Sequence, residues 1–347
     1  MTSKSNGMNR RALLRGAALS TLAAPALVGK GLAQGAVTWR VQSHWPKASS
    51  SFDDSLGVLA NEITEKTDGA FKFELFGDGE FAKGSEIYNL VRKGVVPMGT
   101  ASASYFQDKA QAASFIYGIP GTMRESWEIQ YMAKKGGLED MVNEELNPDG
   151  VMLKSDKVLP TEMVLSRKIE KADDFRGLKI RSSGTMLDYL QAAGAAPQYI
   201  PGSELYQALS SGVVDGAHWG AAIGAKSMSL WEVCKYHYKP TLAFTTDSYI
   251  YNIDQYEALD DDMRDVFDTV IETRFYERSS EYQLGEAQAL TAGIENEGIE
   301  VVQLPDDVLE ILANASTQIL EQEAQKGPIA QKAADLYMQM MTDLGYA

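Results

Sequence analysis

Arg181 is the residue of this sequence best placed to do chemistry. It ends a predicted strand at 177–181, and the small residues Ser182, Ser183 and Gly184 follow it. A guanidinium presents N–H donors in a fork that matches a carboxylate with two parallel bonds. The small neighbours leave space for a ligand in front of it. The pattern therefore predicts an anion-binding arginine, and the alternative is a surface arginine paired with a nearby acid.

Trp219 and His218 come at the end of another predicted strand, the third of the unit that begins with the Arg181 strand. Consecutive residues of a strand point to opposite faces, so we expect one of the two to line a cleft and the other to pack inward. A tryptophan offers an apolar wall and one N–H donor. His218 has two interpretations, either a structural, hydrogen-bonded residue or a group that binds ligand.

Tyr105 and Asp247 are further candidates for the same cleft. Tyr105 lies at the carboxyl end of a strand predicted near 95–100, where its ring faces either a ligand or the core. Asp247 begins a β-rich segment at 247–252, where the chain is expected to return toward the first half. A solvated loop carboxylate is the alternative for Asp247.

The segment 177–219 has the pattern of a strand–helix–strand–helix–strand unit. Arg181 and Trp219 then meet at one edge of a sheet, where open α/β folds hold small ligands. The segment 37–76 likewise predicts a strand, a helix and a parallel strand with a right-handed crossover.

The first and second halves of the chain share a short pattern. A helix end, a glycine, two valines and a strand occur at 93–99 and again at 211–216. This repetition predicts an α/β protein with two similar lobes, and the chain is expected to cross between them at 155–160. A long helix with an acidic start is predicted at 260–292, since acidic residues favour a helix N-terminus.

Enzyme signatures are missing from the sequence. It has no phosphate-binding loop, no Gly-x-Ser-x-Gly elbow and no His-Glu-x-x-His helix, and its three histidines lack metal-ligand spacing. The single cysteine, Cys234, forms no internal disulfide and is expected to be a small buried residue.

Residues 1–33 have the layout of a cleaved export signal. They contain five basic and no acidic residues, with paired arginines before a mildly apolar run at 16–29, which resembles the twin-arginine type. That run is shorter than the roughly 20 residues of a spanning helix. We therefore expect a periplasmic protein. Cleavage takes the formal net charge from −16 to −21, which argues against nucleic acid and anionic membranes as partners.

Several motifs of the chain resemble the solute-binding proteins of TRAP transporters, the DctP family. The resemblance extends over nearly all of the chain after the signal, and its most specific parts are GLKIR (177–181), GAAP (194–197), ELYQAL (204–209) and GVVDGA (212–217). It implies a two-lobed periplasmic binding protein fold of type II character, with hinge strands and a long helix spanning the lobes.

The resemblance also implies roles for individual residues. The arginine at the position of Arg181 grips the substrate carboxylate, a second arginine at the position of Arg167 assists it, and Trp219 lines the site. The Trp39-Arg40 strand, Trp219 and the aromatic segment at 236–238 are similar to the branch that binds 2-oxo and 2-hydroxy monocarboxylates.

In that branch an acidic residue precedes the tryptophan, and a sodium or calcium ion can bridge protein and ligand. This chain has His218 at that place, and an imidazole is a poor ligand for ions that prefer oxygen. The Trp219 carbonyl and Asp247 are the remaining candidate metal ligands.

The sequence as a whole predicts an extracytoplasmic receptor, not an enzyme, that binds a small organic anion and delivers it to TRAP permease subunits. Lobe I is expected at 34–157 and about 246–285, and lobe II at 158–245 and about 286–347. A homodimer, a secreted α/β enzyme acting on a small carboxylate, and a sensory binding protein remain open.

Overall fold

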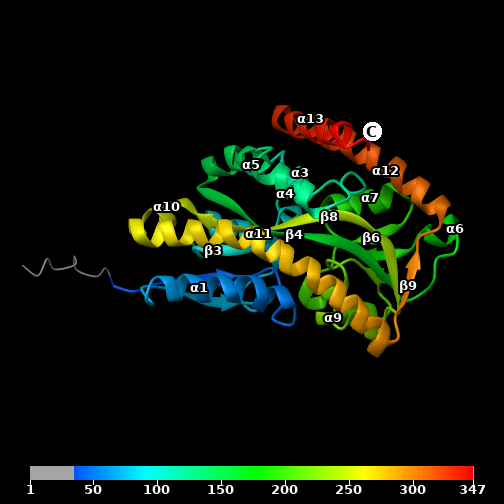
Figure 1. Ribbon diagram of the computed structural model, residues 1–347, viewed down its shortest axis with the longest axis horizontal. Coiled ribbons are helices and arrows are strands. Elements are labelled where there is room, and N and C mark those ends of the chain that lie inside the picture. Colours follow the sequence, from blue (N-terminus) through cyan, green and yellow to red (C-terminus); the bar gives the residue numbers. More distant parts are fainter. Residues whose placement is uncertain (1–34, 347) are drawn as a thin grey trace, which may run out of the picture. The chain divides into compact units, whose positions relative to one another are not determined.

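The strands of the computed structural model, which describes residues 35–346, form one mixed sheet (Figure 1). The order is β2-β1-β3-β8-β4-β7-β5-β6, and β9 pairs with β8 beside this path. The predicted export signal at 1–33 lies outside the described residues. The strands are β1 (Val37–Gln42), β2 (Phe71–Phe76), β3 (Met98–Ser102), β4 (Val151–Leu165), β5 (Lys179–Arg181), β6 (Ala196–Gln198), β7 (Gly216–Ala217), β8 (Tyr236–Asn252) and β9 (Glu300–Gln303).

The first strands form the parallel pair that the sequence predicts. β1 pairs in parallel with β2 over six positions, and η1 (Phe52–Gly57) and α1 (Val58–Lys66) make the connection. Trp39 and Val41 are buried while Arg40 between them is exposed, as the alternation of a strand requires. The Trp39 ring meets the Phe71 ring edge-on at 4.9 Å, which holds the two strands together from the core side.

The unit predicted around Arg181 is also confirmed. β5 pairs in parallel with both β6 and β7, and Arg181 stands opposite Ala217. The connecting helices are α7 (Gly184–Ala192), η5 (Gly202–Glu204) and α8 (Leu205–Ser210). Because β5 and β7 run in the same direction, their carboxyl ends place Arg181, His218 and Trp219 at one edge of the sheet.

Two long antiparallel strands, β4 and β8, run through the middle of the sheet. They pair from Val151 opposite Asn252 to Leu165 opposite Tyr236, with register shifts near 155–157 and 161–163. We expected two shorter strands separated by a crossing at 155–160, and the structure has one continuous strand there. Pro160 is accommodated beside the second register shift, where a proline disturbs the ladder least.

The predicted long helix is present as α11 (Asp261–Ala292), the yellow to orange helix in Figure 1. Asp260 caps it by accepting the N–H of Met263 at 2.8 Å. The helix contacts α1, β4 and α9 (Ala222–Ser227) in turn. It thus touches the helix between β1 and β2 as well as the helix that follows β7.

The remaining helices cover the faces of the sheet. They are η2 (Gly84–Glu86), α2 (Ile87–Arg92), η3 (Ala103–Tyr105), α3 (Ala113–Tyr117), α4 (Ser126–Lys134), α5 (Leu138–Leu146), η4 (Asn147–Asp149), α6 (Ala172–Phe175), η6 (Leu230–Glu232), α10 (Ile253–Glu257), η7 (Gly293–Glu297), α12 (Asp306–Ala324) and α13 (Pro328–Asp343).

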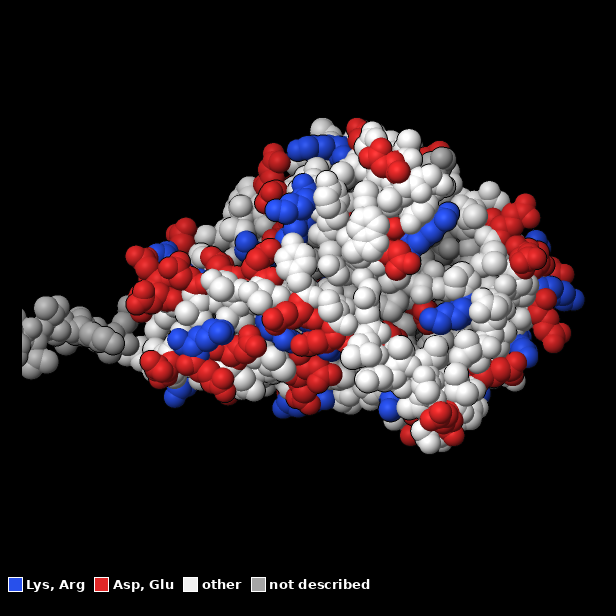
Figure 2. Space-filling model, viewed as in Figure 1, with Lys and Arg blue, Asp and Glu red and all other residues white. Residues whose placement is uncertain are grey.

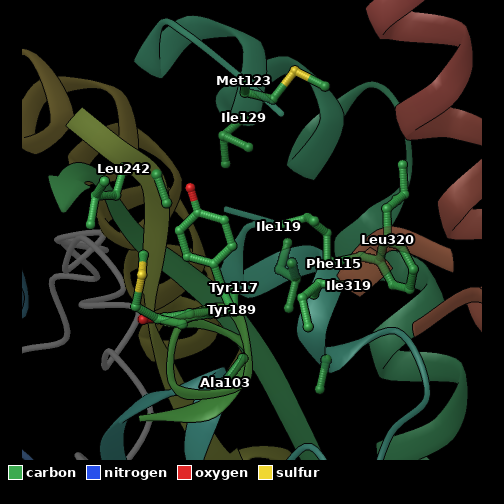
Figure 3. Packing of buried hydrophobic residues seen from close by; sticks show 14 of the residues in the cluster. Ala103, Phe115, Tyr117, Ile119, Met123, Ile129, Tyr189, Leu242, Ile319 and Leu320 are labelled. Atoms are coloured by element: carbon green, nitrogen blue, oxygen red, sulfur yellow. The ribbon is translucent and has the colours of Figure 1, made fainter. Parts of the chain in front are cut away.

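The largest buried cluster joins residues that are far apart in the sequence. Figure 3 shows part of it, with side chains from α3, α4, α7, β8 and α12 packed together. α13 packs against α3 and α5, and the Tyr337 hydroxyl donates to the Phe115 carbonyl at 2.7 Å. The last helix is therefore fastened to elements that the sequence places in lobe I.

The surface carries mixed charge. On the face seen in Figure 2, basic side chains lie among acidic ones instead of forming a continuous basic stripe. No helix within residues 35–346 combines the length and the apolar character that crossing a bilayer requires.

Candidate functional site

A cavity of about 60 Å³ lies where the sheet edge, the loop after β1 and the long helix meet. Most of its walls are aromatic rings and hydroxyl groups, with one arginine and one carboxylate among them. The lining side chains include His44, Trp45, Ser49, Ser51, Ser102, Tyr105, Tyr117, Leu159, Thr161, Arg181, Ser183, His218, Trp219, Thr245, Asp247 and Tyr282.

Arg181 is the positive group of this cavity. Its side chain is 2 % exposed, and two backbone carbonyls fix it: Nε donates to Ile200 at 2.9 Å and Nη1 to His218 at 3.0 Å. Nη2 is buried and has no hydrogen-bond partner among the described residues. Since leaving a charged donor unpaired in the interior is costly, the geometry favours an anionic ligand at Nη2.

Trp219 stacks against the same guanidinium. The centre of the Arg181 guanidinium lies 4.8 Å from the centroid of the Trp219 ring, within cation–π range. Glycines make room for this tryptophan: a Cβ on Gly202 would lie 2.3 Å from the ring, and one on Gly224 would lie 1.7 Å from the Trp219 carbonyl oxygen. Two close backbone approaches thus set the position of Trp219.

His218 lines the cavity together with Trp219, contrary to the expectation that only one of them would. β7 ends at Ala217, so strand alternation does not extend to these two residues. The His218 Nε2 lies 2.9 Å from the Ser182 hydroxyl. Burial, reinforced by the Arg181 charge, holds the pKa of His218 well below its usual value, so the ring is neutral at physiological pH.

Two tyrosines, Tyr105 and Tyr117, line the cavity with these groups. Burial raises the pKa of Tyr105 and Tyr117, although the Arg181 charge acts in the opposite direction on both. Asp247 raises the pKa of Tyr117 as well, so this phenol is influenced by both charges. Both hydroxyls therefore keep their protons and can donate hydrogen bonds to a bound anion.

Asp247 is the carboxylate of the cavity, and it is paired. Lys157, fully buried, lies 3.0 Å from Asp247 Oδ2 and 2.8 Å from Asp156 Oδ2, while Nε2 of His44 lies 3.6 Å from Asp247 Oδ1. Burial alone would raise the pKa of Asp247, but Lys157 and His44 outweigh it and hold that pKa below its ordinary value. Asp247 is ionised, and the alternative of a solvated loop carboxylate does not apply.

The rim of the cavity joins opposite ends of the sheet order. Asp78 follows β2, and its two oxygens accept the N–H of Gly84 at 2.8 Å and of Ser203 in η5 at 3.0 Å. At the same rim Lys83 pairs with Glu204 at 2.7 Å. These contacts hold the two sides of the cavity together in the conformation described.

Arg167 does not line this cavity. β4 ends at Leu165, and Arg167 lies in the exposed bend beyond it, outside the cavity lining. The structure thus does not bring Arg167 together with Arg181 in this cavity, and the assisting role that the resemblance implies for it stays a prediction.

Sequence reasoning missed most of the lining residues, among them His44 and Tyr117, and it missed Lys157, which pairs with Asp247. The only available signal was for His44, which directly follows the first predicted strand and so lies at its carboxyl end. Lys157 meets Asp247 across the β4–β8 ladder, 90 residues away in the chain. Nothing local in the sequence indicates that pairing.

Comparison with known proteins identifies the family. The family model described as bacterial extracellular solute-binding protein, family 7 (DctP), matches residues 42–326. The chain belongs to this family. The family assignment and the two-lobed α/β fold predicted from the sequence are thus confirmed, and proteins of this family are solute-binding receptors.

The similarity extends to a named relative and to solved structures. The monocarboxylate 2-oxoacid-binding periplasmic protein of Nostoc sp. is 25% identical over 92% of this chain and 90% of its own. A TRAP solute-binding protein from Bordetella bronchiseptica has a TM-score of 0.83 and 22% identity, covering 90% of this chain and 93% of its own. That protein was crystallised as a mixed-occupancy dimer with calcium and picolinate.

A second solved structure comes from Pseudoalteromonas atlantica. It is a TRAP periplasmic solute-binding protein with bound sodium and pyruvate, and has a TM-score of 0.82 and 21% identity. It covers 89% of this chain and 95% of its own. At this level of identity the two structures establish the fold alone.

The two solved structures contain calcium or sodium, and this chain has two candidate ligands for such a cation. Of the two candidate ligands, the Trp219 carbonyl packs against Gly224, and Asp247 already pairs with a lysine ammonium. Within residues 35–346 no group of three or more acidic, histidine or cysteine side chains is placed to hold a metal ion. Calcium and sodium take several oxygen ligands, so an ion in this cavity would need oxygens of the bound ligand in addition to Asp247 and the Trp219 carbonyl.

Proposed function

We propose that the chain is the extracytoplasmic receptor of a TRAP importer and binds a small organic anion in the Arg181 cavity. The observation that carries this proposal is the buried Nη2 of Arg181, which faces a cavity of about 60 Å³ without a protein partner. Holding one water takes roughly 10–15 Å³ on this measure, so the cavity suits a ligand of only a few non-hydrogen atoms. The carboxylates bound by the relatives, pyruvate and picolinate, support the same ligand class.

The route of delivery is part of the proposal. The twin-arginine-like segment at 1–33 would export the chain to the periplasm, where membrane permease subunits receive the ligand from the receptor. We retain 34–157 with about 246–285, and 158–245 with about 286–347, as the proposed lobes, closing on the ligand about β4 and β8. The α13 contacts with α3 and α5 favour moving that helix to lobe I. Sedimentation velocity of the purified protein would show whether it forms a homodimer.

A panel of small carboxylates tests the proposal. Because a ligand that binds only the native state stabilises it, a cognate carboxylate should raise the melting temperature in proportion to its concentration. NMR of the recovered ligand should show it unchanged after long incubation, as a receptor requires. Turnover of the ligand would favour the secreted-enzyme alternative, and no shift with any carboxylate would contradict the proposal.

A further inference from the structure

We propose that the cavity selects a small carboxylate that carries its own hydrogen-bond donor, a hydroxyl or ammonium group beside the carboxylate, and binds it without a bridging cation. The proposal rests on the function proposed above and narrows its ligand class. It follows from the carboxylate that shares the cavity with Arg181.

The cavity has two poles of opposite sign. Arg181 offers unpaired donors at one pole, and Asp247, 9 % exposed, lies at the other. Both charges act on the Tyr117 phenol, which also lines the cavity. A ligand that fills so small a space and places its carboxylate on Arg181 must therefore present its remaining atoms near Asp247.

One oxygen of Asp247 is left for the ligand. Oδ2 is taken by the Lys157 ammonium at 3.0 Å. Among the described residues Oδ1 faces His44 Nε2 at 3.6 Å, a distance at which the imidazole still acts on the carboxylate charge but does not form a hydrogen bond, so Oδ1 can accept one from a ligand. An ionised carboxylate oxygen accepts hydrogen bonds and donates none. The group that meets Oδ1 should thus be a donor.

This requirement separates two kinds of ligand. A 2-oxo acid such as pyruvate offers only acceptor oxygens. Its ketone oxygen would then face the Asp247 carboxylate with no hydrogen between the two oxygens, and they would repel each other. A cation between them would relieve the conflict, and the neighbours above hold pyruvate with sodium and picolinate with calcium. Here Lys157 already supplies the positive charge behind Asp247, 4.2 Å over the Trp45 ring. A hydroxyl or ammonium on the ligand satisfies Oδ1 directly.

Calorimetric titration of the unmodified protein tests the proposal. The titrants are lactate, alanine, pyruvate and acetate, each in a choline buffer with a chelator and again with calcium or sodium. Lactate or alanine should bind at least about tenfold more tightly than pyruvate, because pyruvate leaves a buried acceptor unpaired. Calcium or sodium should change the affinities less than twofold. The lactate and alanine arms identify whether the donor is a hydroxyl or an ammonium.

The Asp247→Asn variant tests the residue itself. An amide can turn its N–H₂ toward a ketone, so the preference for lactate or alanine over pyruvate should fall at least about tenfold. Asp254→Asn makes the same chemical change at an exposed residue of α10 and should leave the preference unaltered. If Asp247→Asn fails to fold without Lys157's partner, the titrations of the unmodified protein still decide the proposal.

The outcomes separate this inference from the proposed function. Preference for pyruvate, or tight binding only with calcium or sodium, overturns the inference and leaves the carboxylate receptor intact. If no carboxylate binds under any of these conditions, the proposed function fails as well.

Discussion

At the scale of single residues, the site consists of charged groups that the protein holds in fixed states. Arg181 is oriented by two carbonyls and a tryptophan ring, and Asp247 is kept ionised by Lys157. His218, beside Arg181, is kept neutral by burial and by the arginine charge. Because their protonation states and positions are fixed before a ligand arrives, little free energy is spent on ordering these groups when the ligand binds.

The neutral His218 leads to a prediction for stability. Below about pH 6.5 the unfolded chain protonates this histidine while the native state does not, so the free energy of unfolding should decrease as the pH falls. The His218→Asn variant should show a smaller decrease between about pH 7 and pH 5 in denaturant titrations. An identical pH profile for both proteins would contradict a buried neutral imidazole. NMR of the ring should show no titration of His218 over the same range.

At the scale of elements, the position of Trp219 depends on the start of α9. Gly224→Ala would place a Cβ 1.7 Å from the Trp219 carbonyl oxygen, so the helix or the loop before it must move. We expect a loss of about 1–3 kcal/mol in stability and at least tenfold weaker ligand binding. Denaturant unfolding and calorimetry measure the two effects.

Gly57→Ala is the matched control for this prediction. Gly57 has a helical φ of −62°, and an added Cβ would meet only the Phe52 carbonyl oxygen at 3.5 Å, an ordinary contact. Its stability and affinity should match those of the unmodified protein. Equal effects of the two substitutions would show that the close approach at Gly224 has no special role.

Glu286 on α11 fastens the same helix start. Its carboxylate accepts the N–H groups of Ala222 at 2.5 Å and Ile223 at 3.1 Å. Burial raises the pKa of Glu286 to about 7. The two N–H groups lower this pKa, and the negative charge of Glu162 raises it further, but burial has the largest effect. The native state therefore holds a proton between about pH 4.5 and pH 7 that the unfolded chain releases. This stabilisation is complete below about pH 4.5 and is lost as the pH rises through 7.

The Glu286→Gln variant removes this dependence. Relative to the variant, the unmodified protein should lose about 2–3 kcal/mol of unfolding free energy between pH 5 and pH 8. Parallel denaturant titrations at the two pH values give the comparison. A constant difference between the two proteins would show that Glu286 does not titrate in this window.

The elements also show what the sequence could predict. The strands and helices around Arg181 were predictable because their apolar pattern and their contacts are local, and parallel strands bring their ends together by necessity. The continuous β4 and β8 were not, since Pro160 and Pro240 interrupt the pattern and only long-range pairing overrides them. For the same reason the Lys157–Asp247 pair, made across that ladder, was invisible in the sequence.

At the scale of the whole molecule, the negative net charge of −16 and an anionic ligand are compatible. Surface carboxylates more than about 8 Å from the cavity are largely screened at physiological salt. The buried guanidinium of Arg181 acts at contact distance, where screening by salt is weak. Local charge thus decides which ligand binds, while net charge affects solubility and encounter.

The rim contacts predict how closure responds to mutation. Asp78, 6 % exposed, accepts N–H groups from both sides of the cavity, so Asp78→Ala leaves Gly84 and Ser203 without their acceptor. We expect a larger radius of gyration by X-ray scattering and ligand dissociation at least about tenfold faster. Lys83→Ala, which removes only an exposed ion pair at the same rim, should change either quantity little. Equal effects of the two variants would show that the hydrogen bonds of Asp78 do not hold the two sides of the cavity together.

The central claim is that Arg181 holds the carboxylate of the ligand, and calorimetry on Arg181→Ala tests it most directly. The variant should lose about 2 kcal/mol or more of binding free energy for the cognate carboxylate. Arg167→Ala, an exposed arginine outside the cavity, should bind as the unmodified protein does. Unchanged affinity in Arg181→Ala, with the variant folded, would contradict the assignment of this cavity as the binding site.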